Sequence, residues 1–276
     1  MIKAFSPGNI NCVFAIVPNK DPLKKGSLGV SFAVDKGAIA EVSRSKTNVI
    51  VVNGVKKRFP TVETALAFLT KEPLKVNIKA QLPIGCGYGM SGACTLAALF
   101  AANEFLKLKK SKKTLGLMAH KAEVLNNTGL GTVAAEFIGG LLMRDKKARP
   151  LSAKRLKIDT KTVYYKSFGP IDTKKVIASE KMKKVINKYG IISIERIKSM
   201  KRLKLKELIN ISRWFSGKTG LLKNKRVIKT IKEIERNNGA ASMNMLGNSV
   251  FSNIPFRGCE KLEISEKGAY ILKLEN

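Results

Sequence analysis

Cysteine is scarce in this sequence and is not arranged as in a metal site or a disulfide framework. The four cysteines, Cys12, Cys86, Cys94 and Cys259, lie far apart, and none belongs to a C-x-x-C pair. Zinc sites and small disulfide-stabilised folds need paired or closely spaced cysteines. We therefore expect reduced, mostly buried thiols, as in a cytoplasmic protein.

Long apolar runs are also absent. No run reaches the ~18 residues that a membrane-spanning helix requires. The first residues, MIKAFSPGNINCVF, lack the basic segment and apolar core of a signal peptide. We therefore expect a soluble cytoplasmic protein with no membrane partner.

Acidic residues are few compared with basic ones. There are 20 Asp and Glu against 52 Lys and Arg, which gives a net charge of +32. Such an excess occurs in nucleic-acid-binding proteins, so this class remains an alternative. The lysines are nevertheless spread along the chain, and no aromatic-basic motif or recognition helix accompanies them. We predict no specific nucleic-acid partner, although the positive field would attract small anionic ligands.

The order of predicted elements indicates an α+β protein. With 276 residues and 44% hydrophobic content, the chain is long enough for two domains. Short β-branched runs predict strands, and amphipathic runs between them predict helices, the first of which is capped by Thr61. The predicted strands of the first half are 11–17, 28–34, 48–52 and 74–82, and its predicted helices are 61–71, one opening near 90, 111–129 and 132–144.

A polar, basic, proline-bearing stretch at 145–161 looks like a domain boundary. We accordingly predict an N-terminal domain at 1–158 and a C-terminal domain at 159–276. In the second half the patterns predict a strand at 162–168, lysine-rich amphipathic helices through 238, a glycine-containing helix at 239–251 and a final strand at 268–275.

The most informative segment is LPIGCGYGMSGACTLAALFAANEF, residues 82–105. It places four glycines around Ser91, between a predicted strand and a predicted helix. In that position several backbone N–H groups converge at the positive end of the helix dipole, so the segment is suited to bind phosphate. Glycines permit positive φ angles and a close approach of the phosphate oxygens. A tight turn that only packs a helix closely is the structural alternative.

Two common phosphate-binding motifs fit poorly. Residues 87–92 satisfy G-x-G-x-x-G, but a dinucleotide-binding unit needs a second strand with an acidic residue soon after the helix. Here the pattern predicts helix after helix from 93 to 144. The segment SGKTG at 216–220 ends like a Walker A loop, yet Ser212 stands where its first glycine should be and no strand precedes it.

The third candidate fits. The loop resembles the P-x-x-x-G-x-G-x-S-[SG]-A motif of the GHMP kinase superfamily. The segments SPGNI, KGSLGVSF, LPIGCGYGMSGA, AHKAEVLNNTGLGTVAAEFIGGLLMR and GAASMNMLGNSVF, which span residues 6–251, resemble the archaeal pantoate kinase family in order and spacing. The resemblance implies a two-domain α+β GHMP kinase fold with the active site in the cleft between the domains. It also implies ATP-dependent, magnesium-assisted phosphorylation of (R)-pantoate to 4-phosphopantoate in coenzyme A biosynthesis; a homodimer remains an open expectation.

The same resemblance implies roles for individual residues. Ser91 and Glu123 would serve the triphosphate and its magnesium, and His120, three residues before Glu123, would lie on the same helical face and contact the acceptor. Arg144 would grip the acceptor carboxylate with a guanidinium fork that lysine cannot reproduce. The nucleotide-binding residues implied are Pro83, Gly85, Gly87, Gly89, Ser91, Gly92 and Ala93, and the substrate-binding residues are Ser27, His120, Arg144 and Thr173.

One departure from the family concerns the catalytic position 132. Many relatives have an aspartate there, as a candidate base, whereas this chain has Thr132, which cannot accept a proton at neutral pH. Phosphoryl transfer depends mainly on positioning and charge stabilisation, so activity is still expected. A different acceptor, such as homoserine or mevalonate, or a role for Glu136 remain alternatives.

Overall fold

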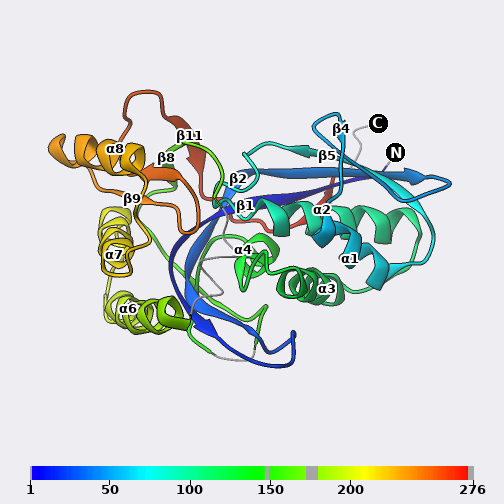
Figure 1. Cartoon of the computed structure of the whole chain (residues 1–276), viewed down its shortest axis with the longest axis horizontal. Helices are drawn as coiled ribbons and strands as arrows, with labels where there is room; N and C mark the ends of the chain where they lie inside the picture. Colours follow the sequence, from blue (N-terminus) through cyan, green and yellow to red (C-terminus); the bar gives the residue numbers. More distant parts are fainter. Residues whose placement is uncertain (1, 147–148, 172–179, 273–276) are drawn as a thin grey trace.

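Two β-sheets and the helices packed against them make up the structure (Figure 1). The computed structural model describes residues 2–146, 149–171 and 180–272. The larger sheet has the strand order β12-β1-β2-β5-β3-β4, and β6 joins it through β2 and carries β7. Its strands are β1 (Ile2–Val17), β2 (Gly26–Arg44), β3 (Val49–Val52), β4 (Val55–Lys56), β5 (Leu74–Ala80), β6 (Leu141–Arg144), β7 (Lys154–Leu156) and β12 (Tyr270–Leu272).

The long hairpin of β1 and β2 is the backbone of this sheet. Its register runs from Ile2 opposite Val42 to Val17 opposite Gly26, with irregularities between Pro7 and Gly8 and between Asn11 and Val13. Because one residue can bulge out of an antiparallel pair without ending it, β1 continues through a proline and a glycine that would normally mark a strand boundary. All four strands predicted for the first half are confirmed, and β1 and β2 are much longer than predicted.

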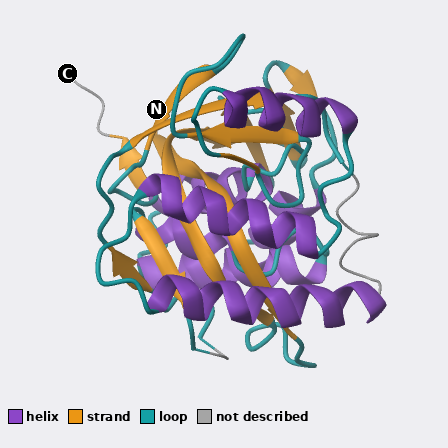
Figure 2. Ribbon diagram, turned by 90° about the vertical axis from the view of Figure 1, so that its left-hand side faces the viewer, coloured by secondary structure: helices purple, strands orange, loops and turns teal. Residues whose placement is uncertain are grey.

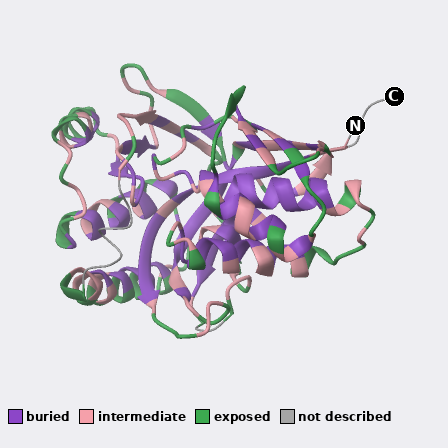
Figure 3. Cartoon of the chain, turned by 45° about the vertical axis from the view of Figure 1, so that its right-hand side comes forward, coloured by how far each residue is buried: buried purple, intermediate pink, exposed green. Residues whose placement is uncertain are grey.

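Four helices cover the larger sheet: α1 (Pro60–Leu69), α2 (Met90–Phe105), α3 (Lys112–Leu125) and α4 (Thr132–Ile138). The central helix is α2, which packs on β1 and β2 and is flanked by α1 and α3, and Figure 3 shows it largely buried. Its alanine and leucine side chains let it pack closely, and nearly every one of them is buried. The start of α2 is thereby held firmly in the middle of the fold.

The smaller sheet has the order β11-β8-β10-β9 and lies beside the larger one, with two of the remaining helices packed on it (Figures 1 and 2). Helix α7 packs on β9, α8 packs on β9 and β10, and α6 packs against β1 of the larger sheet. None of the helices within the described ranges is long and apolar enough to cross a membrane. The elements of this half are β8 (Thr162–Ser167), α6 (Glu180–Lys198), α7 (Leu205–Lys218), α8 (Lys225–Arg236), β9 (Ala241–Met243), β10 (Ser249–Ser252) and β11 (Glu260–Glu263).

The predicted helix at 132–144 is wrong beyond residue 138. Gly139 and Gly140 both have φ of +79°, which ends α4 because right-handed helical residues need negative φ. The chain then continues as β6, where Arg144 pairs with Gly29 of β2. Arg144 therefore belongs to a strand, not to the end of a helix.

The predicted helix at 239–251 is also wrong. This segment forms β9, a turn and β10, with Met243 opposite Val250. Leu246, in the turn, has φ of +63°, which is incompatible with a continuous helix.

Two further expectations differ in detail. Helix α1 begins at Pro60, and its N-cap is Phe59 rather than Thr61; the Phe59 N–H donates to the Glu63 carboxylate at 2.9 Å. The division at 158/159 remains a prediction, but β12 from the end of the chain pairs with β1. The larger sheet therefore contains strands from both halves of the sequence, with β12 at one edge.

Candidate active site

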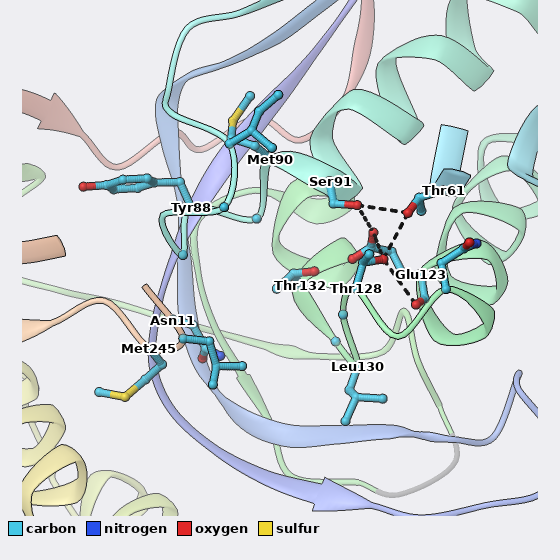
Figure 4. A pocket seen from close by; sticks show the side chains of 18 of the residues that line it. Asn11, Thr61, Tyr88, Met90, Ser91, Glu123, Thr128, Leu130, Thr132 and Met245 are labelled. Carbon is cyan, nitrogen blue, oxygen red and sulfur yellow. Dashed lines mark hydrogen bonds between the residues drawn. The ribbon is translucent and has the colours of Figure 1, made fainter. Parts of the chain in front are cut away.

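A cavity of about 310 Å³ lies at the start of α2, between the two halves of the molecule (Figure 4). The second half contributes Ile171, Met245 and Leu246 to its wall. The first half contributes the glycine-rich loop, the start of α1, the end of α3 and the segment leading into α4. Its lining residues there are Asn11, Phe14, Ser27, Phe59, Pro60, Thr61, Ile84, Gly85, Gly87, Tyr88, Gly89, Met90, Ser91, Glu123, Asn126, Thr128, Gly129, Leu130, Gly131 and Thr132.

The glycine-rich loop connects β5 to α2 in a left-handed conformation at three points. Gly85, Gly87 and Gly89 have φ of +81°, +92° and +63°, and Gly89 is the N-cap of α2. Only glycine adopts such angles without strain, so the sequence GCGYG is needed to bring the loop to the mouth of α2. All three glycines line the cavity. Three other predicted nucleotide-binding residues, Pro83, Gly92 and Ala93, do not line it.

The second half of the chain fixes the outer part of this loop. The Ser249 hydroxyl donates to the Cys86 carbonyl at 2.9 Å, and the Ile171 N–H donates to the Gly85 carbonyl at 3.0 Å. The Ser167 hydroxyl bonds to the Tyr88 hydroxyl at 3.1 Å. The shape of the loop therefore depends on contacts between the two halves.

Ser91 and Glu123, which the family resemblance implies as the residues of the triphosphate and its magnesium, meet at the inner end of the cavity. The Ser91 Oγ donates to Glu123 Oε1 at 2.5 Å, and Thr128 Oγ1 donates to the same oxygen at 2.8 Å. Thr61 lies within 3.3 Å of Ser91 Oγ and 3.1 Å of Thr128 Oγ1, and Figure 4 shows all four side chains converging. Burial raises the pKa of Glu123, and the hydroxyl donors partly oppose this shift.

This donor set suits magnesium bound together with phosphate. Mg²⁺ takes hard oxygen ligands and is usually held by one or two carboxylates, waters and substrate phosphates rather than by an all-protein cage. Glu123 and Ser91 supply one carboxylate and one hydroxyl beside the N-terminus of α2. Across the described residues, no group of three or more His, Cys, Asp and Glu side chains could hold a metal alone.

We expect Ser91→Ala to lower kcat by about 10²-fold, the typical loss when one preorganised polar contact to a transferring group is removed. Folding should change little, because alanine suits the first turn of a helix. Steady-state kinetics and a thermal melt measure the two effects. Ser199→Ala, at an exposed site at the end of α6, is the matched control. Unchanged turnover in Ser91→Ala would show that the loop is only a turn.

Ser27 lies in one wall of the cavity, and Arg144 and His120 lie behind that wall. The Arg144 guanidinium donates to the Gly131 carbonyl and, at 3.2 Å, to the Ser27 hydroxyl. Ser27 and Gly131 line the cavity, whereas Arg144 and His120 do not. His120 is buried, its Nε2 is 3.0 Å from the Lys25 carbonyl, and burial lowers its pKa.

The remaining predicted positions differ in their access to the cavity. Thr132 lines it, and its buried hydroxyl makes no hydrogen bond of regular geometry to a described residue, although it lies near enough to Glu123 to oppose the rise that burial causes in the pKa of that carboxyl. The buried Oδ1 of Asn11, which also lines the cavity, is unpartnered in the same part of the structure. Such atoms are costly unless a ligand or water bonds to them. Glu136 does not line the cavity, and Thr173 lies outside the described residues.

Sequence reasoning missed Thr61 and Thr128, which complete the hydroxyl cluster around Glu123. Thr128 lies within the quoted segment AHKAEVLNNTGLG, so the motif contained a usable signal. The local sequence predicts Thr61 to be a helix cap, and it contains no signal that Thr61 belongs to the site. The segment SGKTG is not a phosphate loop, because it forms the C-terminal end of α7.

Comparisons with known proteins identify the family. Residues 52–140 match the model of the GHMP kinases N terminal domain. The pantoate kinase of Methanocaldococcus jannaschii is 30% identical over 90% of this chain and 90% of its own length. The homoserine kinase of Sulfurisphaera tokodaii is 35% identical, but over only 30% of this chain and 28% of its own.

A solved structure described as "Phosphotransferase related to CoA biosynthesis pathway" superposes with a TM-score of 0.85 at 22% identity, and it covers 100% of this chain and 99% of the other. This likeness confirms the predicted two-domain α+β fold. The identity of 30% to a pantoate kinase extends over nearly the full length of the chain. Together with the matching loop, it assigns the sequence to a family. The chain belongs to the pantoate kinase family of the GHMP kinases.

Proposed function

We propose that this chain transfers the γ-phosphoryl group of ATP to the hydroxymethyl oxygen of (R)-pantoate, with Mg²⁺, and releases 4-phosphopantoate for coenzyme A biosynthesis. A cytoplasmic location in an archaeal cell is part of the proposal. The observation that carries it is the Ser91–Glu123 pair, joined at 2.5 Å at the first turn of α2 and on the wall of the cavity. The family relationship supplies the acceptor.

The nucleotide end of the cavity would lie at the glycine loop. The first N–H groups of a helix have no partner within that helix, so those of α2 are available to the phosphate oxygens, and the dipole of α2 favours their charge. Ser91 and Glu123 would hold the magnesium, which on binding would neutralise charge on the transferring phosphoryl group. These contacts would bind and stabilise the negatively charged phosphates at one place, and the protein would form no covalent bond to them.

The acceptor end would lie near Thr132, Ser27 and Gly131. The Thr132 hydroxyl, which lines the cavity, is suited to orient the attacking hydroxyl group of pantoate by a hydrogen bond. Glu123 is the one acidic residue among the described residues that line the cavity, so no second carboxylate is available there as a base. Late deprotonation in a loose transition state is consistent with that arrangement. Arg144 holds Gly131 and Ser27, and His120 lies against the Lys25 carbonyl, so both would act on the acceptor through this wall rather than from within the cavity. Thr173 is proposed as a further acceptor contact.

The alternative acceptors are homoserine and mevalonate, because kinases of both types share part of the sequence. A panel of purified protein, ATP, Mg²⁺ and each acceptor, read by product mass and by kcat/KM, tests the proposal. We expect pantoate to exceed homoserine, mevalonate and pantothenate by at least about 10²-fold, since a site that pairs buried polar groups with one substrate strongly rejects analogues lacking the partner groups. Preference for homoserine or mevalonate would overturn the acceptor assignment and leave the fold intact.

A further inference from the structure

Gly92 is a glycine that the backbone conformation does not explain. The loop glycines 85, 87 and 89 have positive φ angles, but Gly92 does not and lies in the first turn of α2. Glycine in a helix costs about 1 kcal/mol relative to alanine. A phosphate would not require it either, because Gly92 is buried and does not line the cavity.

The space next to Gly92 is filled by the carboxyl group of Glu136. A Cβ atom at residue 92 would lie under 3.0 Å from Glu136 Oε2, and one at Gly89 would lie equally close to Glu136 Oε1. Real Cβ atoms do not approach other heavy atoms so closely. Glu136 therefore presses against the inner side of the same turn whose outer side faces the cavity.

Glu136 is held firmly in that position. Its side chain is completely buried, and Asn9 Nδ2 of β1 donates to its Oε1 at 2.6 Å. Its backbone carbonyl accepts from the Ala269 N–H at 2.8 Å. Glu136 Oε2 has no hydrogen-bond partner in the described part of the chain. Burial, and next the charge of Glu123, raise the pKa of Glu136 well above its usual value, and the hydrogen bond from Asn9 opposes this shift.

A buried polar group with a free acceptor is destabilising, and so is a helical glycine. Two destabilising features at one contact are consistent with a functional benefit at a neighbouring site. The contact fixes the position of the first turn of α2, which carries the Ser91 hydroxyl, and this position is the benefit that we infer. Displacing that turn by a fraction of an ångström would move Ser91 away from Glu123 and the N–H groups away from the phosphates.

We propose that Glu136 and Gly92 form a matched pair that sets the position of the first turn of α2 and thereby the affinity for nucleotide. Glu136 is a positioning residue, which acts by its shape from behind the loop. This inference rests on the proposed function only in that the turn binds the phosphates of ATP.

The test is a cycle of Gly92→Ala, Glu136→Ala and the double variant, with the Kd for ATP·Mg²⁺ measured by calorimetry and the Tm by thermal melt. Gly92→Ala should raise the Kd at least about 10-fold, a loss of about 1.4 kcal/mol. The double variant should bind ATP more tightly and melt higher than Gly92→Ala alone, because the added methyl group occupies the vacated space. Glu136→Gln keeps the shape of the side chain, so its Kd should be within about threefold of the wild-type value. That difference corresponds to less than about 1.4 kcal/mol.

Gly217→Ala is the matched control, because Gly217 lies in α7 and a Cβ there would have 3.5 Å of clearance from its nearest neighbour, Arg213. It should leave the Kd unchanged. A double variant no better than Gly92→Ala in both Kd and Tm would overturn the pairing, as would a Glu136→Gln defect as large as that of Glu136→Ala. If Gly92→Ala does not fold, recovery of folded protein in the double variant decides the question. Failure of the wild-type protein to bind ATP would instead count against the proposed function.

Discussion

Glu123→Gln is expected to lower kcat by about 10²- to 10³-fold, the range found when one preorganised charge-stabilising group is removed. Glu123 Oε1 accepts hydrogen bonds from both Ser91 and Thr128, and glutamine preserves the volume and one carbonyl acceptor. It removes the negative charge that a magnesium ion requires. Turnover should therefore fall while the Ser91–Thr128 cluster stays in place.

The melting temperature is the control for this variant. Burial raises the pKa of Glu123 in the folded protein, so between the unfolded and the folded pKa the native state binds a proton that the unfolded state has lost. Stability from this group therefore falls as pH rises through that window. Glutamine is neutral, so it does not carry the cost of burying a charged carboxylate. Without metal, Glu123→Gln should therefore melt at or above the wild-type temperature at neutral pH. A large drop in Tm, or full activity with Mg²⁺, would contradict the assigned role.

Arg144→Ala is expected to raise the KM for pantoate by about 10- to 150-fold, because it removes hydrogen bonds from a charged group, worth about 1.5 to 3 kcal/mol, that hold Gly131 and Ser27 in the cavity wall. Burial lowers the pKa of Arg144 only to about 10, so the group is charged at neutral pH. Its bonds to Gly131 and Ser27 fix two residues of the cavity wall on the acceptor side. Because the nucleotide would be held by the glycine loop and Ser91, the KM for ATP should change far less.

Arg144→Lys should recover only part of the loss, since an ammonium group gives a point charge without the planar fork. Arg202→Ala, at an exposed position after α6, removes the same charge away from the cavity and should leave both KM values unchanged. Steady-state kinetics with each substrate varied separates the outcomes. Parallel rises in both KM values, or full recovery with lysine, would make Arg144 a general electrostatic or structural residue.

The parts of the site that the sequence predicts are those whose chemistry depends on local spacing. Glycines at 85, 87 and 89 before an apolar helix predict a phosphate loop because positive φ angles and a helix N-terminus are both local properties. The family resemblance implies a magnesium role for both Ser91 and Glu123, and the structure brings their oxygens to 2.5 Å.

The errors lie where tertiary pairing overrides local pattern. Residues 141–144 became a strand because β2 offers a free edge at Gly29–Phe32, and residues 241–252 became a hairpin because β8 pairs with β10. Neither partner is close in sequence. Thr61 could not be predicted for the same reason, because it contacts Thr128 and Ser91 only after α1, α2 and α3 pack together.

The most direct test of the central claim is ³¹P NMR of the purified protein with ATP, Mg²⁺ and (R)-pantoate, alongside Glu123→Gln. We expect the wild type to produce ADP and a phosphomonoester whose phosphorus couples to the methylene protons of the hydroxymethyl carbon, and Glu123→Gln to produce little of either. Release of inorganic phosphate without the phosphomonoester, or equal product from both proteins, would contradict phosphoryl transfer to pantoate at the Ser91–Glu123 site.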